Sequence, residues 1–224
     1  MKALEFIIEA VEARIQHAED IIFWEGSKGA KRTLEALKRL EQGGHNDVTI
    51  KWDGSPAIIF GRDESGDFIL TDKGGFVAKS YNGKAKSGDE VQQMILNRPG
   101  AKIPEKADGF KQLAGAMKNA FVAFEKAMPK DFRGYYKGDL LYFTTPPKKE
   151  DSFVFTPNIV TYTVKADSDI GKRIAQSTYG IVIHIHMDEN GIDRKLTQAD
   201  MNTMQGGDVL VIPPVTAQKA PVID

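Results

Sequence analysis

The stretch TIKWDGSPAIIFGR, residues 49–62, carries the pattern from which the fold is predicted. In TIKWD, apolar and polar residues alternate with the period of two that is typical of a half-buried β-strand. The residues DGSP have turn composition, and Ala57 to Phe60 form a second short apolar run. We therefore predict a strand, a turn and a strand, with Lys51 and Asp53 on the polar face of the first strand.

The surrounding sequence predicts an α+β fold. A turn at 64–67 and a strand at 68–70 extend the pair into an antiparallel meander, and residues 110–128 have the apolar spacing of a long helix. No βαβ rhythm is present, which favours α+β over α/β. Further strands are expected at 135–143, 158–164, 180–187 and 208–212. We predict an N-terminal helical appendage over residues 1–44 and a core over residues 45–224.

Composition and charge exclude several classes of function. The 224 residues include no cysteine, which excludes disulfides, a thiol nucleophile and a cysteine-ligated zinc site. The formal net charge of -1 means that nucleic acid would have to be bound by a local basic patch. No apolar run approaches the roughly 20 residues of a membrane span, and Glu5, Glu9 and Glu12 interrupt the N-terminal apolar stretch. We expect a cytoplasmic protein without a membrane partner.

Lys51 is the first candidate for chemistry. A lysine held on a strand beside Gly54 could attack a phosphorus atom if it were neutral, because glycine lets the main chain approach a ligand closely. Asp53 would oppose the loss of the lysine's charge unless other cations offset it. The alternative is an ordinary ion pair between Lys51 and Asp53 on a half-exposed strand.

Lys51-Trp52-Asp53-Gly54 has the form K-x-D-G and resembles the first motif of the superfamily of ATP-dependent DNA ligases, RNA ligases and mRNA-capping enzymes. In that superfamily the motif lysine accepts a nucleotide through a phosphoramide bond. Most of the chain is also similar to uncharacterised ligase-like proteins of tailed phages and marine genomes, through EDIIFWEGSKGAKRTLEAL, KWDGSPAIIFGRD, YYKGDLLYFTTP and TPNIVTYTV. The resemblance implies an antiparallel-sheet nucleotidyltransferase core with Lys51 as the catalytic residue.

The resemblance implies roles for further residues of the nucleotide site. Gly138-Asp139 is similar to the third motif, in which an acidic residue lies near the ribose and the metal ion, so Asp139 is a candidate for cofactor and Mg²⁺ binding. Phe155 and Tyr162 lie in the segment where the superfamily has an aromatic side chain that stacks on the base, and Tyr162 is the candidate for cofactor binding. Asp53 and Gly54 contact the nucleotide by the same implication.

The remaining motifs depart from the superfamily pattern. Gly180 to His184 resembles E-G-x-V-x-K, but Tyr179 replaces the glutamate and His184 replaces the lysine. Pro56 stands where an arginine is usual, and Arg62 is the candidate to substitute for it. The final K-x-K motif is not identifiable, and we expect the remaining motifs to lie beyond Asp224, with degeneration in place as the alternative.

A pair of histidines and a lysine-rich segment are further candidate binding sites. His184 and His186 share a face of a predicted strand and could bind a metal, although ordinary polar-face histidines are the favoured interpretation. Between residues 73 and 86 the chain has glycines, Phe76 and Tyr81 but no acidic residue, and it carries the lysines Lys73, Lys79, Lys84 and Lys86. Such a loop can bind phosphates of a nucleotide or nucleic acid, or it can be a solvated loop.

Together these expectations describe an ATP- and Mg²⁺-dependent enzyme. Lys51 would form lysyl-AMP, and the AMP would pass to a DNA or RNA 5′-phosphate before a 3′-hydroxyl displaces it. GTP is not excluded as the nucleotide. The alternative is a non-catalytic nucleic-acid-binding protein that retains the ligase fold, and a third possibility is an accessory domain with a protein partner.

Overall fold

The computed structural model describes residues 20–41, 49–50, 52–72, 75–76, 85–194, 196–204, 207–212 and 215–216. Contacts between residues divide the chain into two compact units, which are considered separately: Met1–Ile50 with Val215–Asp224, and Lys51–Pro214. From the sequence, the boundary between the helical appendage and the core is expected after residue 44. The contacts place it after Ile50 and group the C-terminal residues with the N-terminal ones.

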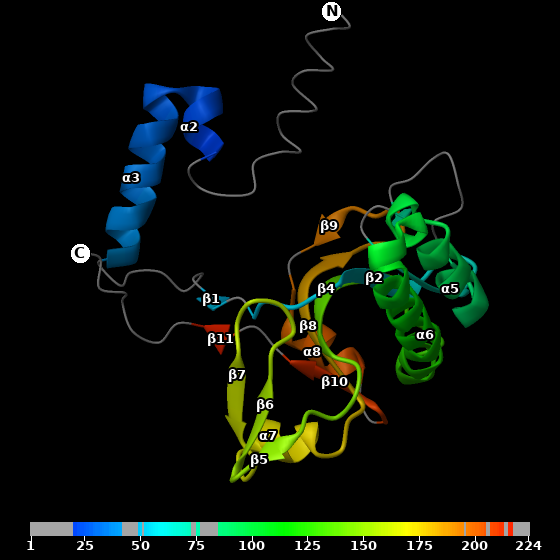
Figure 1. Cartoon of the computed structure of the whole chain (residues 1–224). Helices are drawn as coiled ribbons and strands as arrows, with labels where there is room; N and C mark the ends of the chain where they lie inside the picture. Colours follow the sequence, from blue (N-terminus) through cyan, green and yellow to red (C-terminus); the bar gives the residue numbers. More distant parts are fainter. Residues whose placement is uncertain are drawn as a thin grey trace, which may run out of the picture. The chain divides into compact units, whose positions relative to one another are not determined.

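The described residues of the first unit form two helices and a short antiparallel pair of strands (Figure 1). Helix α2 (Asp20–Glu25) packs closely on α3 (Ser27–Glu41), since a Cβ at Gly29 would lie only 2.4 Å from the carbonyl oxygen of Ile21. Strand β1 (Thr49–Ile50) pairs with β11 (Val215–Thr216). In the part of the chain that is described, none of the helices has the length and apolar character needed to cross a bilayer.

The second unit is built on a six-stranded sheet, and the predicted α+β class is confirmed. The strand order is β10-β8-β4-β2-β3, with β9 paired to β8, and every pair is antiparallel except β8 with β10. The strands are β2 (Ala57–Arg62), β3 (Phe68–Asp72), β4 (Gly134–Tyr142), β8 (Tyr179–Met187), β9 (Asp193–Arg194) and β10 (Val209–Ile212).

The predicted three-stranded meander is only partly correct. Strands β2 and β3 form the expected hairpin, but β1 ends at Ile50 and pairs with β11 instead of β2. Trp52, Asp53 and Gly54 lie outside any strand. The main-chain groups of this segment form hydrogen bonds outside a β2 ladder: those of Asp53 bond to the Tyr162 hydroxyl, and the N of Ser55 donates to the carbonyl oxygen of Leu140.

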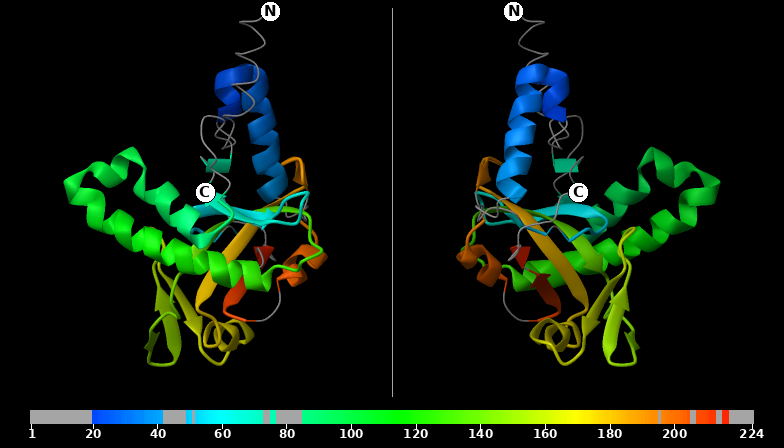
Figure 2. Two further views of the ribbon diagram at one scale, coloured as in Figure 1. Left: turned by 90° about the vertical axis from the view of Figure 1, so that its right-hand side faces the viewer. Right: turned by 90° about the vertical axis from the view of Figure 1, so that its left-hand side faces the viewer.

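Two helices cover one face of the sheet, here called the helix face (Figures 1 and 2). They are α5 (Gly88–Leu96) and α6 (Pro104–Ala127), joined through the 3₁₀ helix Pro99–Lys102. The predicted apolar stripe of α6 is buried against the sheet. The ring of Phe124 lies edge-on to that of Phe60 and the ring of Phe121 edge-on to that of Phe68, each with 5.0 Å between ring centroids. Such edge-to-face pairs stabilise a core beyond the area that they bury.

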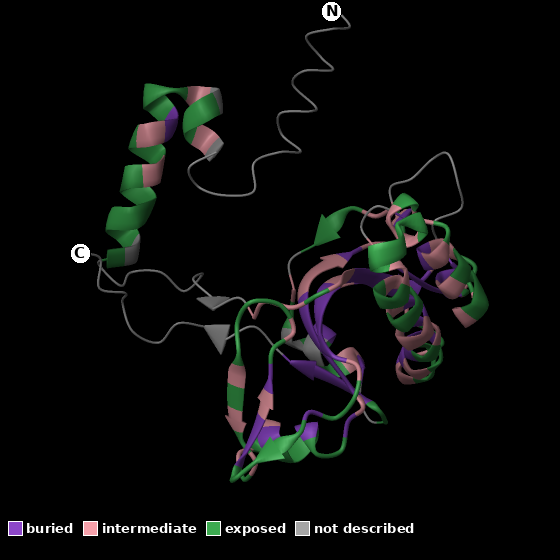
Figure 3. Cartoon of the chain, in the orientation of Figure 1, coloured by how far each residue is buried: buried purple, intermediate pink, exposed green. Residues whose placement is uncertain are grey.

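The opposite face, here called the hairpin face, carries a second layer. It consists of β5 (Lys148–Lys149), β6 (Ser152–Phe155) and β7 (Tyr162–Lys165), which form a three-stranded sheet, and of α7 (Asp169–Ile174). The buried residues of this layer, coloured in Figure 3, pack against the sheet in one cluster. The cluster contains Leu141, Tyr142, Phe153, Phe155, Ile174, Val182, Leu210 and Ile212.

Helix α8 (Gln198–Thr203) is anchored to the sheet by Asp200. Asp200 is buried, accepts hydrogen bonds from Tyr136 Oη at 2.9 Å and from the main-chain N of Thr197 at 2.6 Å, and lies 2.9 Å from His186 Nδ1. Burial opposes ionisation, but the bonds from Thr197 and Tyr136 and the charge of His186 outweigh it and lower the pKa of Asp200.

Arg62 is buried at the end of β2 and binds four main-chain carbonyls. Its guanidinium donates to the carbonyl oxygens of Pro129 (2.9 Å), Gly66 (3.1 Å), Glu125 (3.2 Å) and Met128 (3.2 Å). The last two belong to the C-terminal turn of α6, whose carbonyls have no partner within the helix. Arg62 therefore joins the end of α6 to the sheet.

We predict that Arg62→Met lowers the free energy of unfolding by about 3 kcal/mol, because four carbonyls lose the guanidinium donor, one of them buried and three partly buried. Arg133→Met is the matched control, since Arg133 also donates to two carbonyls but is exposed. The control should change stability by less than about 0.5 kcal/mol. Urea unfolding measures both variants, and equal losses would contradict the role given to Arg62.

We also predict that Asp200→Asn destabilises the protein by about 2 kcal/mol at neutral pH. Because the folded pKa of Asp200 is lowered, its contribution is fully present above the ordinary value of 3.8 and is lost as pH falls through the folded value. The difference between the parent and the variant should therefore shrink in acid. Urea unfolding at several pH values tests this, and a difference that grows below pH 3.8 would be the wrong sign.

Candidate functional site

The segment Trp52–Gly54 lies against β4 at the start of β2. A Cβ on Gly54 would be 2.4 Å from the carbonyl oxygen of Leu140 and 3.0 Å from Cβ of Asp139. The main-chain N of Ser55 donates to the same Leu140 oxygen at 2.9 Å. Glycine is required here because any side chain would collide with the β4 backbone. Gly54 is thereby held beside Asp139, although the two residues are far apart in the sequence.

Asp53 is bound by the connection between β6 and β7. Its main-chain N donates to Tyr162 Oη at 2.6 Å, and Tyr162 Oη donates to its carbonyl oxygen at 3.2 Å. Its carboxylate Oδ2 accepts a hydrogen bond of 2.8 Å from Asn158 Nδ2. The Trp52 ring lies 4.7 Å from the Tyr162 ring. The structure therefore brings Asp53 and Tyr162 together, as direct partners of each other.

A polar patch, formed by Lys137, Asp139 and His184, lies on the hairpin face. Asp139 pairs in register with Ala57 of β2 and is buried, and its Oδ2 lies 3.0 Å from His184 Nε2. Lys137 is half-buried and shares the face of Asp139, two residues earlier on β4. Apolar clusters around Leu141 and Tyr135 lie on the same face on either side of the patch.

A β-bulge in β8 creates this arrangement. Lys137 pairs with Ile185 whereas the next residue, Gly138, pairs with Ile183, so His184 is the extra residue. Ile183 packs on the helix face and Ile185 on the hairpin face. Without the bulge, these two residues would lie on the same face.

The expectation that His184 and His186 share a face is therefore wrong. His184 bonds to Asp139 on the hairpin face, whereas His186 pairs with Asp200 and lies 5.1 Å from the ring of Tyr136 on the helix face. The extra residue in β8 shifts the alternation of side chains by one position, so the two histidines lie on opposite faces of the sheet. They cannot bind one metal ion together.

Several predicted site residues lie outside the described residues. These are Lys51, Lys73, Lys79 and Lys84. Lys86 is described: it forms ion pairs with Asp67 (2.7 Å) and Asp63 (3.1 Å), and these bonds raise its pKa to about 12. Arg62 lies at the opposite end of β2 from Ala57, which is the β2 partner of Asp139.

The donor set fits Mg²⁺ only if the metal takes most of its ligands from phosphate and water. Among the residues that the structure describes, no three His, Asp or Glu side chains form a group that could hold a metal ion. Protein-bound Mg²⁺ commonly uses one or two carboxylates and completes its shell with phosphates and water. Asp139 is the carboxylate in the polar patch, and it can supply one such ligand.

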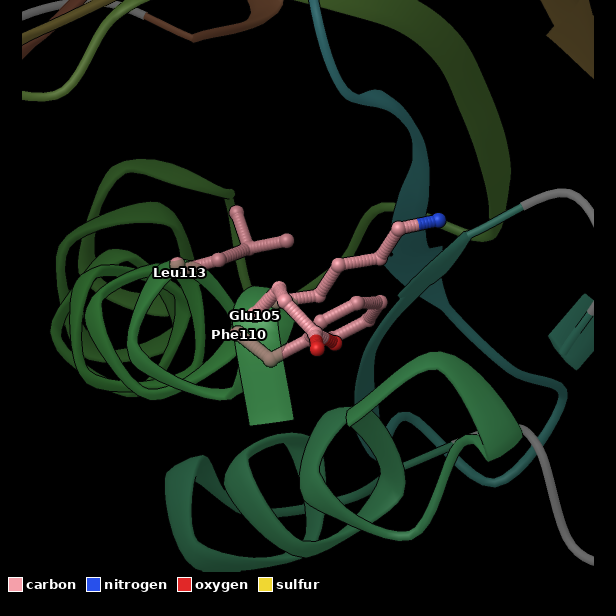
Figure 4. A pocket seen from close by; sticks show the side chains of 5 residues that line it. Glu105, Phe110 and Leu113 are labelled. Carbon is pink, nitrogen blue, oxygen red and sulfur yellow. The ribbon is translucent and has the colours of Figure 1, made fainter. Parts of the chain in front are cut away.

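A hollow on α6 is unrelated to these residues (Figure 4). It has a volume of about 320 Å³ and is lined by Glu105, Lys106, Gly109, Phe110 and Leu113. Phe110 and Leu113 pack against the core of the helix face. The hollow is therefore on the other side of the sheet from the polar patch.

Sequence reasoning missed two residues that complete the site. Asn158 falls within the strand expected at 158–164, but strand β7 begins later, at Tyr162, and Asn158 lies in the turn before it. An Asn after Pro157 is a turn signal that could have been used. Lys137 could have been found from its spacing of two residues from Asp139.

Comparison with known proteins identifies a family. The family described as a family of unknown function, DUF6267, matches residues 12–221. No curated protein and no solved structure matches the chain.

We predict that Gly54→Ala lowers the free energy of unfolding by about 1–3 kcal/mol, because the added methyl group would overlap the Leu140 carbonyl. Gly115→Ala in α6 is the control: nothing lies within 4 Å of its added Cβ, and helix propensity favours alanine there by about 0.8–1 kcal/mol. Denaturant midpoints measure both. A Gly54→Ala variant as stable as the control would rule out the close approach to β4.

Proposed function

Since the chain belongs to the DUF6267 family, whose function is unknown, we propose its function from the site itself. We infer that it is a nucleotidyltransferase of the ATP-dependent polynucleotide ligase type that forms lysyl-AMP at Lys51. The observation that carries this proposal is the meeting of three motif positions. Asp53-Gly54, Asp139 and His184 come from distant parts of the sequence and lie next to one another.

This meeting supports the proposal because the three positions resemble separate motifs of one superfamily and lie far apart in the sequence. Asp53-Gly54 precedes β2, Asp139 lies on β4 and His184 on β8, and these strands are neighbours in the sheet. A catalytic site needs its groups to converge, and these three positions do so. Two other positions suggested by the resemblance lie elsewhere: Arg62 is at the far end of β2, and Tyr179 is on the helix face.

The chemistry assigned to Lys51 is a displacement at phosphorus. Its neutral amine attacks the α-phosphorus of ATP; a P–N bond forms, the P–O bond to pyrophosphate breaks, and the amine loses a proton to solvent. The AMP then passes to a 5′-phosphate of DNA or RNA, and a 3′-hydroxyl displaces it. Lys137 and His184 are the described side chains of the patch that could bind phosphate oxygens.

Mg²⁺ would be held by Asp139 together with phosphate oxygens and water, and when bound it would neutralise charge on the phosphates. Asp139 also orients His184, because its carboxylate bonds to the ring nitrogen Nε2. The trio of Lys137, Asp139 and His184 therefore supplies both signs of charge in one small area. Such an area suits a ligand that carries phosphates and a cation.

A second candidate is a nucleic-acid-binding protein without catalysis. Tyr179, which replaces the motif glutamate, is buried and packs 6.1 Å from the ring of Phe124 in the core of the helix face. The carboxylates of Asp53 and Asp139 already have protein partners in Asn158 and His184. These features favour a fold that is retained while the chemistry is lost.

We predict that the protein takes label from α-³²P-ATP but not from γ-³²P-ATP, and that Lys51→Arg abolishes the labelling. Arginine keeps the positive charge but cannot supply a neutral amine. Lys111→Arg is the control, since Lys111 is a surface lysine on α6 paired only with Asp108. The labelled bond should be lost in acid and resist alkali, as a phosphoramide does.

The labelling experiment separates the two candidate functions. Label on the parent and on Lys111→Arg but not on Lys51→Arg supports the enzyme. Retention of label by Lys51→Arg would show that Lys51 is not the acceptor. An unlabelled parent that still binds a nicked duplex or single-stranded RNA would instead favour the non-catalytic protein. Adding unlabelled GTP or ATP as a competitor identifies the preferred nucleotide.

A further inference from the structure

Tyr162 and Asn158 hold the segment that follows Lys51. We propose that they are positioning residues: they fix Asp53, and through it they place Lys51, while Asp53 itself is not a ligand of the nucleotide. The inference rests on the proposed function for its consequence in catalysis. Its structural part, a clamp on Asp53 made by Tyr162 and Asn158, is independent of that function.

The clamp binds three groups of Asp53: its main-chain N, its carbonyl oxygen and the carboxylate oxygen Oδ2. The Tyr162 hydroxyl accepts from the main-chain N of Asp53 at 2.6 Å and donates its one proton to the carbonyl oxygen at 3.2 Å. Asn158 Nδ2 donates to the carboxylate at 2.8 Å. Both main-chain groups of Asp53 are therefore bound to Tyr162, and one oxygen of its carboxylate is bound to Asn158.

The clamp is needed because the segment has no strand partner of its own. Trp52 and Asp53 lie outside any strand, and the first ladder residue after them is Ala57. Unpaired main-chain groups of such a segment need partners elsewhere. Lys51 is bonded directly to Trp52, so the clamp on Asp53 begins two residues after the catalytic lysine.

An aromatic series connects the clamp to the core. The Tyr162 ring lies 4.7 Å from Trp52 and 5.5 Å from Phe155, and Phe155 lies 5.5 Å from Tyr142. Phe155 and Tyr142 are buried. The Tyr162 ring is thus used to pack against the protein's own Trp52, and this differs from the stacking on a nucleotide base that the resemblance implies.

Amide hydrogen exchange tests the clamp directly. In Tyr162→Phe the ring remains and the hydroxyl is lost, so the amides of residues 52–55 should exchange about five- to thirty-fold faster. Tyr142→Phe is the matched control, because it removes a hydroxyl bonded to Ser177 in the same aromatic series without touching Asp53. Exchange in residues 52–55 that is unchanged in Tyr162→Phe, or raised equally in both variants, would overturn the clamp.

Lysyl-AMP formation tests the effect on Lys51. Tyr162→Phe should lower kcat by about ten- to a hundred-fold with KM for ATP within about twofold, since misplacing a reacting group affects the chemical step more than binding. Tyr142→Phe should leave both values near those of the parent. Faster exchange without a change in kcat would overturn the positioning role. If the parent forms no lysyl-AMP, the proposed function fails and the exchange result alone decides the clamp.

A swap of side chains tests whether Asp53 is a ligand. Asn158→Asp places two carboxylates together and should lower kcat at least tenfold, because like charges repel at hydrogen-bond distance. Asn158 is exposed, so this variant should fold. The double variant Asp53→Asn with Asn158→Asp restores an amide–carboxylate bond and should recover at least about a third of the parent kcat. Failure of the double variant to recover, with residues 52–55 again protected from exchange, would show that the Asp53 carboxylate acts on the nucleotide.

Discussion

Close approach between main chains, which only glycine permits, holds the centre of the sheet together. A Cβ at Gly138 would lie 2.2 Å from the carbonyl oxygen of Val182, and one at Gly54 would lie 2.4 Å from that of Leu140. The first approach joins β4 to β8, and the second brings the segment after Lys51 onto β4. Asp139 lies between these two contacts, so its neighbours on both sides are set by the backbone. The polar patch exists because the strands can come this near.

The elements that the sequence predicted well are those in which one period runs without interruption. The apolar spacing from Phe110 to Met128 predicted α6 in this way, and the strand expected at 135–143 corresponds to β4. The partner of β1 could not be predicted, because pairing with β11 depends on residues far away in the chain. The short helices α7 and α8 were missed, since six residues are too few to show a helical period.

The candidate site was predictable in its residue types but not in its contacts. A motif identifies Asp53, Asp139 and His184, but it does not say that Asn158 would bind the first or that the other two would bind each other. Those pairings depend on a turn between two strands and on a bulge, and neither has a period that a sequence scan can detect. The same limit applies to Arg62: a basic residue at a strand end gave no sign that it would bind the end of a helix.

The bulge at His184 has a consequence for how β8 can change in evolution. Odd-numbered side chains change face at the bulge: Ile181 and Ile183 face the helices, whereas Ile185 and Met187 lie on the hairpin face. Deleting His184 would make the strand regular and would keep both faces, because Ile183 and Ile185 would then be consecutive and would still pair with Gly138 and Lys137. Replacing the histidine by another residue would also leave both faces of β8 unchanged. The length of β8 can therefore change by one residue at position 184 without exchanging the faces of its two ends, but that change removes the side chain that bonds to Asp139.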